Sequence, residues 1–489
     1  MSDGASENAF AGLKPEGIWK HFDALTRIAR PSGREEDAVR YVISWAEDHG
    51  FEAVRDQRGN VIVRVPGTSG RESAPVVVIQ GHLDMVCERH SNSPYDAAKG
   101  EMCVVREGDW LTAVGTTLGA DNGLGVAAGM AAAELDEHGP LELLFTLDEE
   151  TGLTGAQNLD ASMITGRIML NLDSEEDGVL FIGCAGGCDS ALVFSGRREA
   201  PAPGSTLLEI SVRGLKGGHS GLDINRNRLN AIKAMARLVL GGGSATEWAL
   251  VSIDGGSMRN AIPRESRAVV SVGSGGADAF RTGVESARKA LMAEFEKTDG
   301  GLEVTVREMG AADADAWTKD DSQRLCHLIQ ALPSGVQAMS QDIEGLVETS
   351  TSLGVVVTDG DQAKLICCSR SSVAAAIRDV LDRIQAIAAL AGVSAQETDA
   401  YPGWQPKMDS PLLAKARSVS ERVFGKPPEV TAIHAGLECG LIGERIPGMD
   451  MISFGPEIRG AHSPDERVSI ESTARFWRMV EALLDELSR

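Results

Sequence analysis

The stretch Val76-Val77-Val78-Ile79-Gln80-Gly81-His82-Leu83-Asp84 indicates the fold class more clearly than any other segment. Its first part, 76–80, is an almost unbroken apolar run, which is typical of a strand buried on both faces of a sheet. Its second part places an imidazole and a carboxylate directly after that strand. In open α/β sheets, ligands bind at the carboxyl ends of the strands. We therefore interpret this stretch as a central strand that is followed by functional side chains.

Strands and helices alternate on both sides of this stretch. Apolar residues recur at helical spacing in some segments, and short β-type runs lie between them. The predicted elements are helices over 15–30, 35–49 and 122–135 and strands over 51–55, 61–65, 141–147 and 168–172. This alternation predicts an α/β fold in which a mixed, mostly parallel sheet has helices on both faces.

Two segments rich in proline, glycine and charge, near 196–205 and 401–411, are candidate crossings between domains. Between them the chain reads twice as strand, helix, strands, helix, strand, which indicates an inserted α+β domain of ferredoxin-like halves. After Pro411 the pattern returns to that of the first domain. The predicted domains are 1–195, 196–400 and 401–489, of which the first and last form one body.

The composition is that of a folded, acidic protein. The chain has 489 residues, 47 Lys and Arg against 71 Asp and Glu, and a formal charge of −24. Hydrophobic residues make up 43% and charged residues 24%, so extended disorder is not expected. The acidic excess disfavours nucleic acid and anionic membranes as partners and favours small cationic or zwitterionic ligands.

Neither a membrane span nor a secretion signal is indicated. No apolar stretch approaches the roughly 18 to 20 residues that a bilayer requires, and 1–10 is polar and acidic. The eight cysteines include no CxxC pairs at zinc-finger spacing, which favours buried thiols. We expect a soluble cytoplasmic protein.

Four clusters of acidic or histidine residues lie at the carboxyl end of a predicted strand or in the loop next to one. They are His82-Leu83-Asp84, Gly119-Ala120-Asp121-Asn122-Gly123, Asp148-Glu149-Glu150 and Asn171-Leu172-Asp173. Each cluster alone has a common structural explanation, because Asp-Asn-Gly favours turns and Glu-Glu pairs usually face solvent. Their shared placement predicts that they converge at one edge of the sheet.

Imidazole and several carboxylates without a thiolate form a ligand set for divalent cations, zinc first, with manganese or cobalt as substitutes. Two cations about 3.5 to 4 Å apart need a shared anionic ligand, and Asp121 suits that role. His82 would supply an imidazole, and Asp84 is placed to orient it through the other ring nitrogen. The clusters therefore predict two divalent metal ions.

The Glu149-Glu150 pair has two acidic side chains where metal-assisted hydrolysis needs one ligand and one free base. We assign Glu149 as the base and Glu150 as the ligand, although spacing alone permits the reverse. Asp121-Asn122-Gly123 lacks the alternating oxygens of a calcium loop. The glycine-rich segments 183–187 and 214–221 lack the ending of a phosphate-binding loop.

These motifs resemble the dinuclear zinc peptidases that include aminoacylase, glutamate carboxypeptidase and the cytosolic dipeptidases, and the resemblance runs nearly end to end. Within that group the sequence is most similar to the Xaa-His dipeptidases. The segments that carry the closer similarity are Gly217–Gly221, His434–Gly440 and Gly460–Glu466.

The resemblance implies a specific ligand set. His82 and Asp173 would hold one metal, Glu150 and His462 would hold the other, and Asp121 would bridge both. It also implies that Glu149 is the general base and that Asp84 steadies His82.

The same resemblance implies that the inserted domain is a lid that carries substrate contacts. His219 would donate to the tetrahedral oxyanion, whereas Asn260 and Arg370 would hold the far end of the substrate. His434 and Glu438 would also contact the substrate, Glu438 at its free amine. The resemblance further implies a homodimer.

The expected activity is metal-dependent hydrolysis of dipeptides, of the Xaa-His type such as β-Ala-His, by a water that Glu149 activates. An alternative keeps the same metals but makes the protein an N-acyl amino acid deacylase. A third interpretation is a catalytically idle metal-binding or assembly protein. It is disfavoured because the expected base and ligands are all present.

Overall fold

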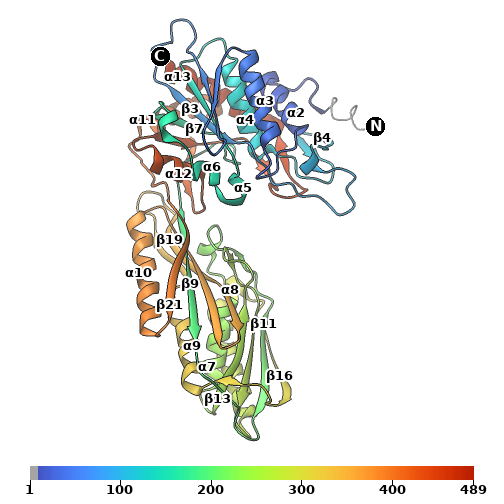
Figure 1. The fold of residues 1–489 in the computed structure, drawn as a ribbon, viewed down its shortest axis with the longest axis vertical. Helices are drawn as coiled ribbons and strands as arrows, with labels where there is room; N and C mark the ends of the chain where they lie inside the picture. The colour runs from blue at the N-terminus through green and yellow to red at the C-terminus, as the bar shows by residue number, and fades with distance from the viewer. Residues whose placement is uncertain (1–8) are drawn as a thin grey trace. The chain divides into compact units, whose positions relative to one another are not determined.

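The computed structural model describes residues 9–489, which form two compact units (Figure 1). Unit 1 contains the chain up to Gly183 together with Trp404–Ala432 and Leu437–Arg489. Unit 2 contains Cys184–Gly403 and the short segment Ile433–Gly436.

Unit 1 is built on an eight-stranded mixed sheet. Its strands, in spatial order, are β1 (Glu52–Arg55), β2 (Val61–Val65), β6 (Leu141–Thr146), β3 (Val77–His82), β7 (Ile168–Asn171), β23 (Asp450–Ser453), β8 (Val179–Cys184) and β22 (Glu429–Ile433). The four central strands, β6, β3, β7 and β23, pair in parallel. Every residue of β3 and β6 is buried, which confirms the predicted central strand. The predicted mostly parallel sheet is thus confirmed at its centre.

Helices cover both faces of this sheet. Side chains of a strand alternate between faces, so Ile79 and Gln80 of β3 point in opposite directions. Ile79 lies against Gly129 of α4, whereas Gln80 bonds to Glu438 of α12. The helices of unit 1 are α2 (Glu16–Thr26), α3 (Glu36–Asp48), α4 (Ala120–Ala133), α5 (Glu149–Gly152), α6 (Thr154–Gln157), α11 (Pro411–Phe424), α12 (Glu438–Arg445) and α13 (Ile470–Ser488).

A small four-stranded sheet lies beside this framework in unit 1. Its strands, in spatial order, are β24 (Ile458–Arg459), β25 (Arg467–Ser469), β5 (Trp110–Ala113) and β4 (Val104–Glu107). Because β25 pairs with β5, the chain near residue 467 is held close to the chain near residue 112. The segments around residues 112 and 467, which are far apart in sequence, therefore lie side by side in unit 1.

Unit 2 contains a nine-stranded sheet made of two ferredoxin-like halves. The first half runs β11 (Thr206–Arg213), α7 (Ala231–Gly242), β13 (Trp248–Gly255), β15 (Ser266–Val272), α8 (Ala277–Asp299) and β16 (Glu303–Ala311). Its spatial order, β16-β11-β15-β13, is that of the ferredoxin-like motif. The second half contains β9 (Gly186–Ser195), α9 (Lys319–Ala331), β19 (Val347–Asp359), β20 (Gln362–Ser371), α10 (Ala374–Leu390) and β21 (Ser394–Tyr401), with β18 (Gly335–Met339) added at β19.

The second half takes its first strand from a distant part of the chain. Its spatial order is β19-β20-β9-β21, so β9 occupies the position of the first strand. The whole first half is inserted between β9 and α9. The sequence analysis places the start of the inserted domain at residue 196, after β9. In the structure unit 2 begins earlier, at Cys184. The reason is that β9 pairs along its length with β20 and β21 and so belongs to the sheet of unit 2.

Two further features bear on the sequence-based expectations. No helix within residues 9–489 is long and apolar enough to cross a bilayer. Among the described residues no two cysteines form a disulfide, and all but Cys87 are buried.

Candidate metal centre

Four of the predicted site residues of unit 1 lie at or just beyond the carboxyl ends of three adjacent parallel strands. His82 is the last residue of β3, and Asp173 lies two residues beyond the end of β7. Glu149 and Glu150 open α5, which follows β6. Since β6, β3 and β7 are neighbours in the sheet, their side chains meet at one edge, as expected for this class of fold.

Asp121 lies between two imidazoles that are distant in sequence. Its Oδ1 is 3.1 Å from His82 Nε2, and its Oδ2 is 3.1 Å from His462 Nε2. Asp121 occupies the first turn of α4, where its backbone is not helical, and Gly119 precedes it with a φ of 69°. A glycine is suited to that position because L side chains rarely adopt this region.

Each imidazole also meets a second carboxylate. Asp173 Oδ1 is 3.3 Å from His82 Nε2, and Glu150 Oε2 is 3.0 Å from His462 Nε2. Two groups of potential ligands result, each with its ligand atoms within 4.8 Å of one another. One group is His82, Asp121 and Asp173, and the other is Asp121, Glu150 and His462. Asp121 belongs to both.

Asp84 is fully buried beneath these residues and holds several of them. Its carboxylate lies 3.3 Å from His82 Nδ1 and accepts hydrogen bonds from the backbone N–H groups of Glu149 and Glu150. Ser32 Oγ donates a further bond of 2.7 Å. Although burial opposes the change, the bonds from His82 and Ser32 lower the pKa of Asp84 to about 2. An ionised Asp84 keeps the His82 proton on Nδ1 and leaves Nε2 as the ligand atom.

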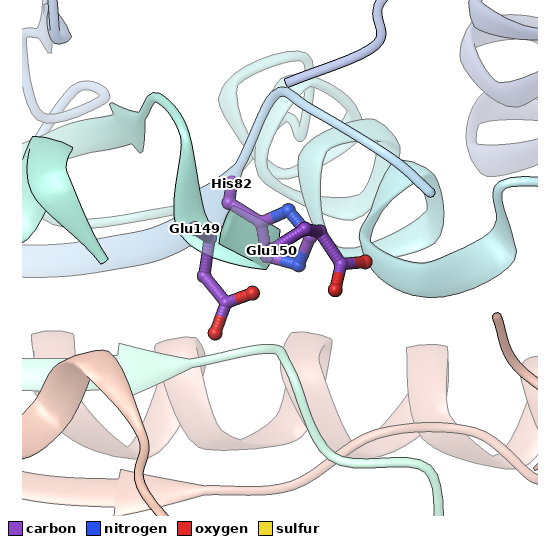
Figure 2. A group of neighbouring side chains, drawn as sticks. All are labelled: His82, Glu149 and Glu150. Atoms are coloured by element: carbon purple, nitrogen blue, oxygen red, sulfur yellow. The ribbon is translucent and has the colours of Figure 1, made fainter. Parts of the chain in front are cut away.

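Glu149 and Glu150 are sequence neighbours with different surroundings. Figure 2 shows their carboxylates turned away from each other near the His82 ring. Glu150 faces His462, whereas no hydrogen bond or ion pair occupies the Glu149 carboxylate within residues 9–489. Burial, followed by the charges of Asp173 and Glu438, raises the pKa of Glu149 well above its usual value. A third group of potential ligands, His82, Glu149 and Glu150, keeps the alternative assignment open.

The electrostatics of the cluster fit bound cations. No Lys or Arg in the described part of the chain lies within ion-pair distance of Asp121, Glu150 or Asp173. Burial and the neighbouring carboxylates raise the pKa of Asp173 to about 6. Hydrogen bonds to Asp121 and Glu150 raise the pKa of His462 to about 11, so a proton on the ring supplies positive charge there.

A buried oxygen atom of Glu150 also indicates that the cluster binds a cation. Glu150 Oε1 is buried and has no hydrogen-bond partner among the described residues, an arrangement that is unfavourable unless another group supplies a contact. The donor set of imidazole nitrogens and carboxylate oxygens is one that divalent transition-metal ions prefer. The residues present therefore fit a metal centre.

Unit 2 contains four of the predicted substrate-contact residues, and it gathers them. His219, Arg370 and His434 all surround Gly221, where an added Cβ would lie 3.1 Å from the His219 ring and 3.2 Å from Arg370 Cδ. Asn260 joins them because its backbone carbonyl accepts a bond of 2.8 Å from Ser220 N.

The ring of His219 has a defined tautomer. Its Nδ1 accepts hydrogen bonds from the backbone N–H groups of Gly221 and Leu222, at 3.2 and 3.0 Å. Burial and the nearby charge of Arg370 lower the pKa of His219, so the neutral ring is favoured. The proton of that neutral ring lies on Nε2, which is left as a donor.

Glu438, to which the family resemblance gives a contact with the substrate amine, lies buried in unit 1. Its side chain is 0% exposed, and its Oε2 accepts bonds of 2.6 Å from Gln80 and from Thr146. Burial raises its pKa to about 7. The bonded oxygen of Glu438 is thus held by side chains of β3 and β6, and its contact with a substrate amine stays a prediction.

Several residues that support the site were missed by sequence reasoning. Arg30, Ser32 and Glu35 lie upstream of every motif, and each contacts a loop that carries a site residue. Glu466 follows His462 by four residues within the segment Gly460–Glu466, but no feature of that segment indicates its contacts. Of these upstream residues, only Ser32 lies in the short segment between the predicted helices 15–30 and 35–49, and its polarity alone does not indicate a contact.

Imidazoles and carboxylates around a shared aspartate, at the carboxyl edge of an α/β sheet, define a candidate metal-dependent hydrolase. A model of peptidase family M20/M25/M40 matches residues 78–486. The chain belongs to that family.

The relatives agree with this assignment over nearly the whole chain. A protein of Escherichia coli K12 named cytosol non-specific dipeptidase is 38% identical over 477 residues, which cover 97% of this chain and 98% of that protein. The crystal structure of aminoacylhistidine dipeptidase from Vibrio alginolyticus is 40% identical, with a TM-score of 0.91 and 98% of each chain covered. Aminopeptidase PepT from Bacillus cereus shares the fold at 15% identity, with a TM-score of 0.57 and coverage of 98% of this chain and 100% of that one.

Proposed function

We propose that this protein is a metal-dependent dipeptidase whose substrates include Xaa-His dipeptides such as β-Ala-His. The observation that carries the proposal is the position of Asp121, whose two oxygens each face a different imidazole. The relatives support the substrate class, since the Escherichia coli protein is named a dipeptidase and the Vibrio protein an aminoacylhistidine dipeptidase.

Two divalent cations, zinc most favourably, would be held by the residues around Asp121. His82 and Asp173 are proposed for one cation and Glu150 and His462 for the other, with Asp121 shared. Such cations, when bound, acidify water and polarise the carbonyl group of the scissile bond. Asp84 fixes the ring of His82 and the backbone of the Glu149-Glu150 pair.

Proton transfer is assigned to Glu149. Within residues 9–489 its carboxylate has no hydrogen-bond or ion-pair partner, so it is available to accept a proton from the attacking water and pass it to the leaving nitrogen. His219 would donate from Nε2 to the oxyanion of the tetrahedral intermediate. Asn260, Arg370 and His434 are proposed to bind the substrate.

The location of the protein in the cell and its oligomeric state are also proposed. A cytoplasmic location is supported by the name of the Escherichia coli relative. A homodimer is expected from the family resemblance, and light scattering of the purified protein tests it.

The proposed activity is tested on a panel of dipeptides with and without chelator. We expect hydrolysis of β-Ala-His and other dipeptides, loss of activity in chelator, and recovery on addition of zinc, manganese or cobalt. An N-acetyl amino acid serves as the comparison substrate, and preference for it would instead identify a deacylase. Unchanged activity in chelator would exclude metal catalysis, and metal binding without turnover would indicate an idle relative.

The role of His219 is tested by its replacement. His219→Ala should lower kcat by about 100- to 1,000-fold with a smaller change in KM, because it removes a donor that acts mainly on the transition state. His219→Gln is the matched variant, since its amide retains an N–H group and should recover part of the rate. Steady-state kinetics measure both, and a wild-type kcat for His219→Ala would contradict the role.

A further inference from the structure

The proposed metal ligands His82, Asp121 and His462 come from three segments that are far apart in sequence. The positions of these segments must be fixed relative to one another, because a metal centre tolerates only small errors in ligand geometry. His462 itself has a φ of 61°, a region that non-glycine residues rarely occupy. Such a backbone persists only where its surroundings hold it.

Glu466 connects the His462 segment to the Asp121 segment. Its carboxylate is almost completely buried and accepts four backbone hydrogen bonds. Oε2 accepts from Leu118 and Gly119 at 2.7 and 2.9 Å, and Oε1 accepts from Ala120 and Asp121 at 2.8 and 3.3 Å. The loop that presents Asp121 is thus bound by one side chain through consecutive N–H groups.

The backbone of Glu466 is fixed as well. Its N–H donates to Ser463 O at 3.0 Å, within the turn that follows His462. Its carbonyl accepts a bond of 2.8 Å from Thr112 Oγ1 on β5. A displacement of the Glu466 side chain would therefore be transmitted in one direction to Asp121 and in the other to His462.

Arg30 connects the same loop to the segment that follows His82. Its guanidinium is 0% exposed and donates to Leu83 O and Asp84 O, at 3.0 and 2.9 Å, and to Gly119 O. A Cβ added at Gly119 would lie 2.5 Å from Arg30 Nη2, and one added at Gly123 would lie 2.7 Å from it. The glycines on either side of Asp121 thus leave the space that Arg30 fills.

We propose that Glu466 and Arg30 are positioning residues that set the separation of His82, Asp121 and His462, and thereby the affinity for the cation pair. This inference rests on the proposed function, since it assumes that these three residues bind metal. Neither Glu466 nor Arg30 is proposed as a metal ligand. Both act through the backbone that carries the ligands.

The test replaces Glu466 by glutamine and measures zinc affinity by competition with a chelator. Glu466→Gln removes one acceptor oxygen and places an NH2 group against backbone N–H donors. We expect zinc affinity to fall by about 10- to 100-fold, the range typical for residues that orient metal ligands. The visible spectrum of the cobalt-loaded protein should also change, because it reports ligand geometry. kcat should fall by more than KM rises.

Glu142→Gln is the matched control. Glu142 is likewise a buried carboxylate that accepts backbone bonds, from Thr165 and Gly166 at 2.9 and 3.0 Å, but it lies near the opposite end of β6 from Glu149. It should lose comparable stability while keeping wild-type zinc affinity and cobalt spectrum.

Arg30→Lys is a second variant, used in case Glu466→Gln does not fold. It keeps a buried positive charge but lacks the planar group that reaches three carbonyls, so zinc affinity should again fall. If the wild-type protein binds no cation, the proposed function fails. If it binds zinc and both variants match Glu142→Gln in affinity and spectrum, the positioning role is overturned while the proposed function stands.

Discussion

Glu149→Gln is expected to keep its bound metal and to lose about 100- to 10,000-fold in kcat, the contribution typical of a general base. Glutamine has nearly the shape of glutamate, but it cannot accept the proton of the attacking water. The surroundings of Glu149 favour this result, because its carboxylate has no hydrogen-bond or ion-pair partner in residues 9–489. Metal analysis and dipeptide kinetics on the same sample measure both quantities.

Glu150→Gln provides the comparison for this result. Glu150 Oε2 lies 3.0 Å from His462 Nε2, and its Oε1 has no hydrogen-bond partner in the part of the chain that the structure describes, so glutamine there should reduce metal content as well as activity. The reverse pattern, in which Glu149→Gln loses metal and Glu150→Gln keeps it, would exchange the two roles. Normal hydrolysis by Glu149→Gln would show that it is not the base.

The central part of the sheet could be predicted because its local signals agree with its final environment. The apolar run 76–80 falls largely within β3, Val77–His82, whose residues are all buried, and 61–65 is β2 as predicted. The clusters around His82, Glu149 and Asp173 converge because parallel neighbours end at the same edge. The convergence of these clusters could be predicted from the fold class and from the position of each cluster directly after a predicted strand.

Long-range features could not be predicted from local patterns. β9 belongs to a half-domain whose other elements follow about residue 318, and no property of 186–195 indicates this pairing. His462 was identified by family resemblance alone, since it lies in a turn without a preceding parallel strand of its own. The bonds of Glu438 to Gln80 and Thr146 could not be predicted either, because a motif does not reveal which side chains of the sheet its residues contact.

The supporting residues escaped prediction for a related reason. Arg30 acts by donating to backbone carbonyl groups, and Glu466 acts by accepting from backbone N–H groups. Backbone groups carry no identity in a sequence, so such contacts leave no pairing of residue types to recognise. Both the pairing of β9 and these backbone contacts are determined by the complete fold, so neither can be predicted from local sequence.

Asp121→Ala is expected to have the largest effect on metal binding, because Asp121 is shared by the group with His82 and Asp173 and the group with Glu150 and His462. Without its carboxylate each remaining group keeps one imidazole and one carboxylate, and the repulsion between two cations is no longer offset by a bridging anion. We expect metal content to fall from two ions to fewer than one per chain, with activity below detection. Elemental analysis after gel filtration measures the first quantity.

The thermal stability of the same variant separates lost binding from lost folding. A ligand at about 100 times its Kd stabilises a protein by about 2.7 kcal/mol, so zinc should raise the Tm of the wild-type protein and leave that of Asp121→Ala unchanged. His462→Ala is the graded control, because it leaves the His82 group intact and should retain about one ion and part of the Tm shift. Two tightly bound ions in Asp121→Ala, or equal losses in the two variants, would contradict a shared aspartate and would favour separate metal sites instead.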